Sequence, residues 1–212
     1  MPTKPIPANQ NAGPIPGPGL TDYVGASQRV FRLALSAMAR PAHRLDFDFD
    51  GLFGPSPPLP PSVAALALTL ADHLTPVWLS PSFAAAEPFL AFHASAPIAR
   101  VPGKAAIVLA ASPKELPELL SLNQGDPRYP DRSTTVILGG ALEATSMGIT
   151  FLATGPGLAE ETIFSDHGLG MDFARQWELN RASYPLGVDV FLAGDGCLAG
   201  LPRSLALIPK PS

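Results

Sequence analysis

The stretch Ala65–Leu79, with the sequence ALALTLADHLTPVWL, decides the fold class. Apolar residues recur there at the three-and-four spacing of a helix, and others fill the opposite side, so the spacing predicts a helix buried almost all round. These residues are Val63, Leu66, Ala67, Leu68, Leu70, Ala71 and Leu74. Ser62 is a suitable N-cap, and Pro76 ends the helix because proline disfavours a helical conformation in the residue before it. Val77–Leu79 then forms a short buried strand, and this succession is typical of a layered α/β domain.

Composition and charge exclude several classes of protein. The chain has 212 residues, 46% of them hydrophobic, which is enough for one substantial core. The formal net charge is −4 and the basic residues are not clustered, which argues against a nucleic acid or an anionic membrane as a partner. The longest apolar run is too short to span a bilayer, and residues 1–20 lack the apolar core of a signal peptide, so we expect a cytoplasmic protein. The lone Cys197 excludes an intrachain disulfide.

The chain divides into a tail and one domain. Prolines and glycines dominate residues 1–20, which have almost nothing large to bury, so we expect a disordered or extended tail. Residues 21–212 form a single α/β domain. Its first helix is capped by Asp22 and ended by Pro41, and its expected apolar face consists of Val24, Phe31, Leu35 and Met38.

The remaining elements predict a mixed β-sheet of about seven strands, flanked by helices on both faces. Apolar runs and alternation place the strands at 45–50, 77–79, 105–111, 134–138, 149–154, 188–192 and 205–208. Ser112 and Glu115 match a capping box, which predicts a helix from Pro113 to about Leu122, and a further helix is expected over 172–181.

Sequence motifs give little support to an enzyme with familiar chemistry. GxSxG, HExxH, paired CxxC, Walker A and GxGxxG signatures are all missing from the sequence. The four histidines have no helical spacing that would bring two imidazoles to one metal, and Asp72-His73 is better explained as a structural helix end. We therefore assign no catalytic residue and no metal ligand, and whether the chain is an enzyme stays open.

Two polar segments are candidates for binding a small anion. Asp126, Arg128, Arg132 and Ser133 precede a predicted strand, and guanidinium groups suit phosphate or phosphonate oxygens. The other interpretation is a solvated loop whose charges, with Asp131, nearly cancel. Gly155 and Gly157 follow a strand end, where open α/β sheets bind ligands. Pro156 removes one of the amides that a phosphate loop would use, so a tight structural turn explains the segment better.

Several stretches in combination resemble the PhnH family, whose members are subunits of the bacterial carbon-phosphorus lyase system for phosphonate utilisation. They are SQRVFRLALSAMARP (27–41), LALTLADHLTPVWLS (66–80), FHASAP (92–97), TTVIL (134–138), LATGPGLAEE (152–161), YPLGVDVFL (184–192) and LAGLPRS (198–204). They occur in the family's order and cover most of residues 21–208.

The resemblance implies a fold similar to the large domain of pyridoxal-phosphate-dependent transferases, without that cofactor. Among the lysines, only Lys104 lies near a strand end, where a Schiff-base lysine would be needed, and a surface role explains it better. A degenerate pyridoxal enzyme that still holds its cofactor is a further alternative.

The resemblance also implies a homodimer alone and a hetero-oligomer with PhnG, PhnI and PhnJ subunits. That assembly forms α-D-ribose 1-methylphosphonate 5-triphosphate from MgATP and methylphosphonate, with release of adenine. No motif assigns a chemical step to this chain, so we expect a non-catalytic accessory subunit. The alternative is an independent small-anion binding protein or enzyme with its site near residues 126–133 and 155–157.

Overall fold

The computed structural model describes residues 17–142, 148–165 and 167–210. The expected tail therefore lies mostly outside the described residues. Its last part is ordered by contacts: the backbone oxygen of Gly17 lies 2.7 Å from Nε2 of His93, and Leu20 is buried and forms a β-bridge with Phe53. The domain thus begins slightly before residue 21.

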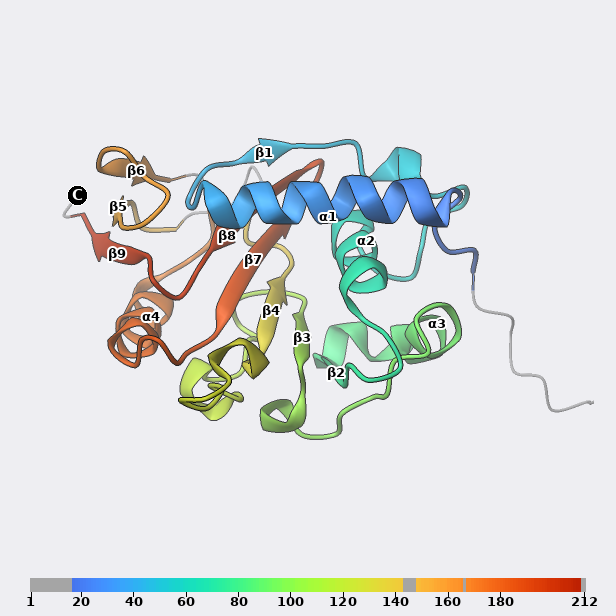
Figure 1. Ribbon diagram of the computed structural model, residues 1–212. Helices are drawn as coiled ribbons and strands as arrows, with labels where there is room; N and C mark the ends of the chain where they lie inside the picture. Colours follow the sequence, from blue (N-terminus) through green and yellow to red (C-terminus); the bar gives the residue numbers. More distant parts are fainter. Residues whose placement is uncertain (1–16, 143–147, 166, 211–212) are drawn as a thin grey trace, which may run out of the picture.

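The larger of two β-sheets has six strands in the order β1-β8-β7-β4-β3-β2 (Figure 1). The strands are β1 (Leu45–Asp46), β2 (Val77–Leu79), β3 (Ile107–Ala110), β4 (Thr135–Leu138), β7 (Asp189–Gly194) and β8 (Cys197–Leu201). β2, β3, β4 and β7 are parallel, whereas β8 and β1 add to the sheet in antiparallel fashion. This is the mixed sheet that the sequence predicts.

A second, antiparallel sheet has the order β6-β5-β9, with β5 (Phe151–Thr154) between β6 (Thr162–Phe164) and β9 (Ala206–Pro209). The prediction of one sheet with about seven strands is therefore wrong in this respect, because the described residues form nine strands in two sheets. The separation follows from the register: both edges of β4 are already taken by β3 and β7, so β5 has to pair elsewhere.

Helices cover both faces of the larger sheet, as predicted. α1 (Tyr23–Ala39), α2 (Pro61–Leu70) and α3 (Glu87–His93) contribute to a core that includes Ile107 and Leu109, whereas α4 (Met171–Ala182) and the small sheet pack on the face of Val108 and Ala110 (Figure 1). Alternate residues of β3 thus belong to opposite cores, as expected for a strand buried on both sides. In the described part of the chain, every helix is too short or too polar to cross a membrane.

The central helix and strand of the opening stretch are confirmed, but their ends differ from the prediction. α2 begins at Pro61, so Ser62 lies buried inside the helix and does not cap it. α2 ends at Leu70 because the Asp72 carboxylate accepts hydrogen bonds from the Leu74 amide (2.8 Å) and the Thr75 hydroxyl (2.6 Å), a local turn that competes with the helix. Leu74 is consequently 76% exposed, and its expected place in the core is wrong.

The helix expected from Pro113 to Leu122 does not form. Only Leu119–Ser121 makes a short 3₁₀ turn. The Glu115 carboxylate does not cap this segment, because it accepts hydrogen bonds from the amide (3.1 Å) and hydroxyl of Ser82 in a distant part of the chain. Pro117 lacks an amide donor and lies where the helix would need one.

The strand expected over 45–50 is also shorter than predicted. Burial alternates as the sequence indicates, with Phe49 buried and Asp48 exposed, but only Leu45–Asp46 pairs with β8. The Asp48 carboxylate accepts a hydrogen bond from the Gly51 amide (3.0 Å), and a 3₁₀ helix over Asp50–Leu52 ends the extended segment.

The buried face of α1 is the largest correction. Its core side consists of the small residues Ala26, Val30, Ala34 and Ala37, whereas the predicted apolar face is largely exposed. Small residues let α1 approach β8 closely: a Cβ on Gly200 would lie 2.5 Å from the Ala37 oxygen. The larger apolar residues Val24, Phe31, Leu35 and Met38, which we name the α1 stripe, lie on another side of the helix, where the first three are exposed and Met38 is partly buried against the core.

Candidate functional site

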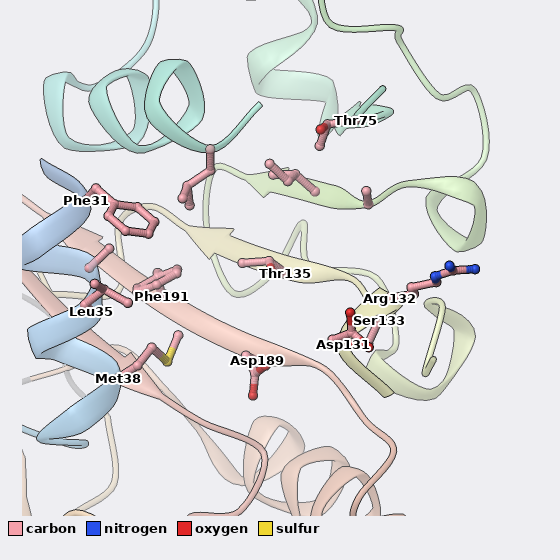
Figure 2. A pocket seen from close by; sticks show the side chains of 14 residues that line it. Phe31, Leu35, Met38, Thr75, Asp131, Arg132, Ser133, Thr135, Asp189 and Phe191 are labelled. Atoms are coloured by element: carbon pink, nitrogen blue, oxygen red, sulfur yellow. The ribbon is translucent and has the colours of Figure 1, made fainter. Parts of the chain in front are cut away.

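The described residues enclose an open groove of about 520 Å³, which we name the α1 groove. Figure 2 shows its arrangement. One wall is formed by Phe31, Leu35 and Met38 of the α1 stripe, the floor by Ile107, Thr135 and Phe191 of the sheet, and the polar end by Asp131, Arg132, Ser133 and Asp189. Ile107, Thr135 and Asp189 stand at the amino ends of their parallel strands, so the groove crosses this edge of the sheet.

The Arg203 side chain forms hydrogen bonds with Asp189 and Ser133, two of the residues at the polar end of the groove. Its side chain is 13% exposed. Nε donates to both carboxylate oxygens of Asp189 (3.1 and 3.2 Å), Nη1 donates to the Pro130 oxygen (2.7 Å) and more weakly to the Pro185 oxygen (3.4 Å), and Nη2 donates to the Ser133 hydroxyl (2.6 Å) and to Asp189. This charge-assisted network ties β7 to the 130–133 segment. Asp189 and Ser133 are thus already bound to the protein itself.

The loop 126–133 is shaped by its own side chains. The Asp126 carboxylate accepts hydrogen bonds from the amides of Arg128 (2.8 Å) and Tyr129 (3.1 Å), which makes a compact turn. The Arg132 guanidinium lies 3.9 Å from the centre of the Tyr129 ring, a cation–π contact. Of the predicted anion-binding residues, Arg132 and Ser133 therefore line the α1 groove, whereas Asp126 and Arg128 belong to the turn behind it.

Of the two predicted glycines, Gly157 lines a different hollow, and neither lines the α1 groove. Gly155 (φ 143°) and Gly157 (φ 90°) adopt positive φ angles, and a Cβ on Gly157 would lie 2.5 Å from the Ala39 oxygen at the carboxyl end of α1. That hollow is lined by Gly157 together with Arg40, His43, Glu160 and Glu161. The carboxyl end of a helix carries partial negative charge, so this position is unfavourable for an anion. The structure does not bring the two predicted segments together in one cavity.

Shifted carboxyl pKa values occur at three surface sites, and at one of them the hydroxyl of Thr75, which lines the α1 groove, lowers the pKa of Asp72. The hydroxyl and amide of Ser82 lower the pKa of Glu115, and the Arg100 guanidinium lowers the pKa of Glu87. Burial raises the pKa of the Cys197 thiol. In residues 17–142, 148–165 and 167–210, no three His, Cys, Asp or Glu side chains gather to form a metal site. These groups serve local structure.

Sequence reasoning missed most of the groove. The α1 stripe was visible as an apolar pattern but was assigned to the core, and Thr135 and Phe191 looked like ordinary strand residues. Asp189 offered a signal, because an acidic residue at the start of a buried strand needs a partner. The arginine of the LAGLPRS stretch, Arg203, is that partner.

Comparisons with known proteins give a consistent result. The family model described as "Bacterial phosphonate metabolism protein (PhnH)" matches residues 18–207. A curated relative from Rhizobium meliloti (strain 1021), the alpha-D-ribose 1-methylphosphonate 5-triphosphate synthase subunit PhnH, is 32% identical over 195 residues. The alignment covers 88% of this chain and 92% of the relative.

Proposed function

Because this chain belongs to the PhnH family of bacterial phosphonate metabolism proteins, we propose that it is an accessory, non-catalytic subunit of a ribose 1-methylphosphonate 5-triphosphate synthase. The observation that carries the proposal is the match to a synthase subunit along almost the whole length of both chains. The α1 groove supports the accessory role, because the Asp189 carboxylate and the Ser133 hydroxyl at its polar end already have a hydrogen-bond partner within the chain, Arg203.

The companions of this subunit are expected to be PhnG, PhnI and PhnJ, and the chain alone is expected to be a homodimer in the cytoplasm. Within that assembly, methylphosphonate and MgATP yield α-D-ribose 1-methylphosphonate 5-triphosphate with release of adenine. This chain supplies binding surface to the assembly, and the choice of phosphonate belongs to other subunits.

The fold is proposed to be related to the large domain of pyridoxal-phosphate-dependent transferases, without the cofactor. Parallel strands covered by helices on both faces support this relationship. Lys104, Lys114 and Lys210 are all exposed, a poor environment for a Schiff-base lysine, which needs a desolvated pocket. Absorbance of a bound aldimine in the purified protein would contradict this proposal.

The test of the subunit role is native mass spectrometry of the chain, alone and co-expressed with the three companion subunits from the same genome. A co-purifying complex of fixed stoichiometry is expected. A chain that stays a free monomer or dimer in the presence of all three companions would refute the subunit role.

A second candidate function is the binding of a small anion, such as a nucleotide or a phosphonate. It is favoured by Arg132 and Ser133, which line a groove whose volume of about 520 Å³ falls within the range of small-molecule sites. Calorimetric titration of the isolated chain with ATP and with methylphosphonate tests it. Binding that is lost in Arg132→Ala would support this alternative, and an absence of heat at millimolar ligand would exclude it.

A further inference from the structure

α1 carries two apolar faces, one buried on the core and the other largely exposed to solvent among the described residues. Ala26, Val30, Ala34 and Ala37 pack on the core. The α1 stripe lies on another side of the helix, where Val24 is 66% exposed, Phe31 47% and Leu35 55%. These residues are spaced so that they share one side of a helix. Three large apolar side chains in one exposed row indicate a contact surface, since single exposed ones would need no explanation.

The stripe borders a gap in the helix layer. α2 ends at Leu70, and the first residues of β3, β4 and β7 line an open groove beside this end of the helix (Figure 2). The α1 groove occupies this position, with Ile107 and Phe191 on its floor. From Phe31 to Met38 the wall is about 10 Å long, from the rise of 1.5 Å per helical residue, which matches about two turns of one further helix.

The polar groups of the groove do not favour a small polar ligand. Asp189 and Ser133 are bonded to Arg203, the Thr75 hydroxyl donates to Asp72 at 2.6 Å, and the Arg132 guanidinium, which has no ion-pair partner among the described residues, stacks on the Tyr129 ring. A small-molecule site needs free polar groups that converge on the ligand. Apolar surface that leads to a few polar groups at one end fits a protein segment better.

The charges at the rims specify the partner further. Arg32 does not line the groove but neighbours Leu35 of the α1 stripe on the helix surface, whereas Arg132 lines the polar end. Neither makes an ion pair with any described residue. Asp131 contributes one negative charge beside them. Although the whole chain has a net charge of −4, the rims are thus slightly positive, which complements acidic residues on a partner.

Two other occupants fit less well. Residues 1–16 of this chain contain five prolines and no acidic residue, so they supply neither a continuous helix nor the complementary charge. The α1 of a second copy has no acidic residue between Tyr23 and Ala39 and would bring Arg29 and Arg32 to the positive rims.

We propose that the α1 groove is the docking site for an amphipathic helix of another subunit, with apolar residues at i, i+3 or i+4, and i+7, and acidic residues beside them. The proposal rests on the subunit role proposed above, which supplies a different polypeptide as the partner. The occupant completes the helix layer over the sheet, and the α1 stripe forms half of the contact.

The main test compares two leucine substitutions that are matched in residue type, helical setting and exposure. Leu35, in the stripe, is 55% exposed, and Leu179, on α4 and outside the groove, is 54% exposed. Each is changed to glutamate, and each variant is co-expressed with the companion subunits and examined by native mass spectrometry and affinity measurement. Leu35→Glu is expected to weaken assembly about tenfold to a hundredfold, because a charge replaces a desolvated side chain. Leu179→Glu is expected to assemble normally.

A second measurement does not depend on weakened binding. Cys197 is the sole cysteine of the sequence and is buried, so Leu35→Cys introduces one reactive thiol. Its labelling by a maleimide is expected to slow at least about tenfold on assembly, as a buried contact excludes the reagent. The thiol of Leu179→Cys is expected to react equally fast in both states.

The outcomes separate the two proposals. If the unmodified chain joins no complex, the proposed subunit role and the proposed docking site are both refuted. If it assembles, and Leu35→Glu assembles equally well with an unprotected thiol in Leu35→Cys, the docking site alone is refuted. A Leu35→Glu variant that loses only self-association would place a second copy in the groove and also refute the proposal.

Discussion

Removal of the Arg203 guanidinium tests how the polar end of the α1 groove is held. The substitution Arg203→Met keeps most of the apolar stem and deletes every guanidinium donor to Asp189, Ser133, Pro130 and Pro185. Asp189 is 27% exposed and still accepts a hydrogen bond from the backbone amide of residue 203 at 2.8 Å. Its carboxylate is therefore left only partly uncompensated.

The magnitude follows from these contacts. Breaking a fully buried ion pair costs about 3–5 kcal/mol, and single hydrogen bonds to charged groups contribute about 1.5–3 kcal/mol without being additive. Water reaches part of Asp189, so we expect the free energy of unfolding to fall by about 3 kcal/mol. For a chain of this size that corresponds to a decrease in Tm of roughly 6–12 °C.

The assay is urea unfolding followed by circular dichroism, with Arg100→Met as the matched control. Arg100 also forms a two-pronged pair, with both Glu87 oxygens at 2.8 Å, but its side chain is 74% exposed. Its loss should destabilise the fold clearly less than the loss of the Arg203 guanidinium, because exposed ion pairs are screened. If Arg203→Met were no more destabilising than Arg100→Met at unchanged denaturant slope, the buried network would not stabilise the fold.

Three further changes test other contacts. Gly200→Ala places a Cβ 2.5 Å from the backbone of α1 and should cost about 1–3 kcal/mol in urea unfolding as the helix shifts. Trp177→Phe removes the indole donor to the Leu205 oxygen (2.9 Å) in a fully buried site, and the unpaired carbonyl should cost about 1–3 kcal/mol in the same assay. The Ser82 hydroxyl lowers the pKa of Glu115 from its ordinary value of 4.5, so ¹³C NMR titration of Ser82→Ala should show a higher pKa. A carboxyl group whose pKa is lower in the folded state stabilises the fold at pH values above its unfolded-state pKa, and this stabilisation is lost as the pH falls through the folded-state pKa. Ser82→Ala lacks part of this stabilisation. Its free energy of unfolding should therefore fall less on acidification than that of the unmodified chain.

The sequence predicted the elements that are buried on all sides. α2 and β2 were recognisable because a run of apolar residues cannot face water in any register. The prediction that such an element is buried does not depend on its exact cap or its exact end. The segment 113–122 failed for the opposite reason. Its apparent cap, Glu115, had a better partner in Ser82, which is 33 residues away and invisible to local patterns.

The groove could not be predicted because α1 has apolar residues on more than one side. A periodic pattern shows that faces exist, but only the neighbouring strand decides which face is buried. On β8 the important residue is Gly200. Because Gly200 has no side chain, the face of α1 that carries small residues can pack closely against the strand.

The position of the α1 groove bears on the accessory role. Ligands of open α/β sheets lie beyond the carboxyl ends of parallel strands, at a point where the strand order reverses. The parallel strands described here run β2-β3-β4-β7 without reversal. The carboxyl ends of β2 and β3 are also closed by their own chain, since the Ser80 amide donates to the Leu109 oxygen (2.9 Å) and the Ser80 hydroxyl accepts from the Ala111 amide (3.1 Å). Open surface is found instead at the amino ends, where it is apolar, and this favours a role for the α1 groove in assembly over a role in chemistry.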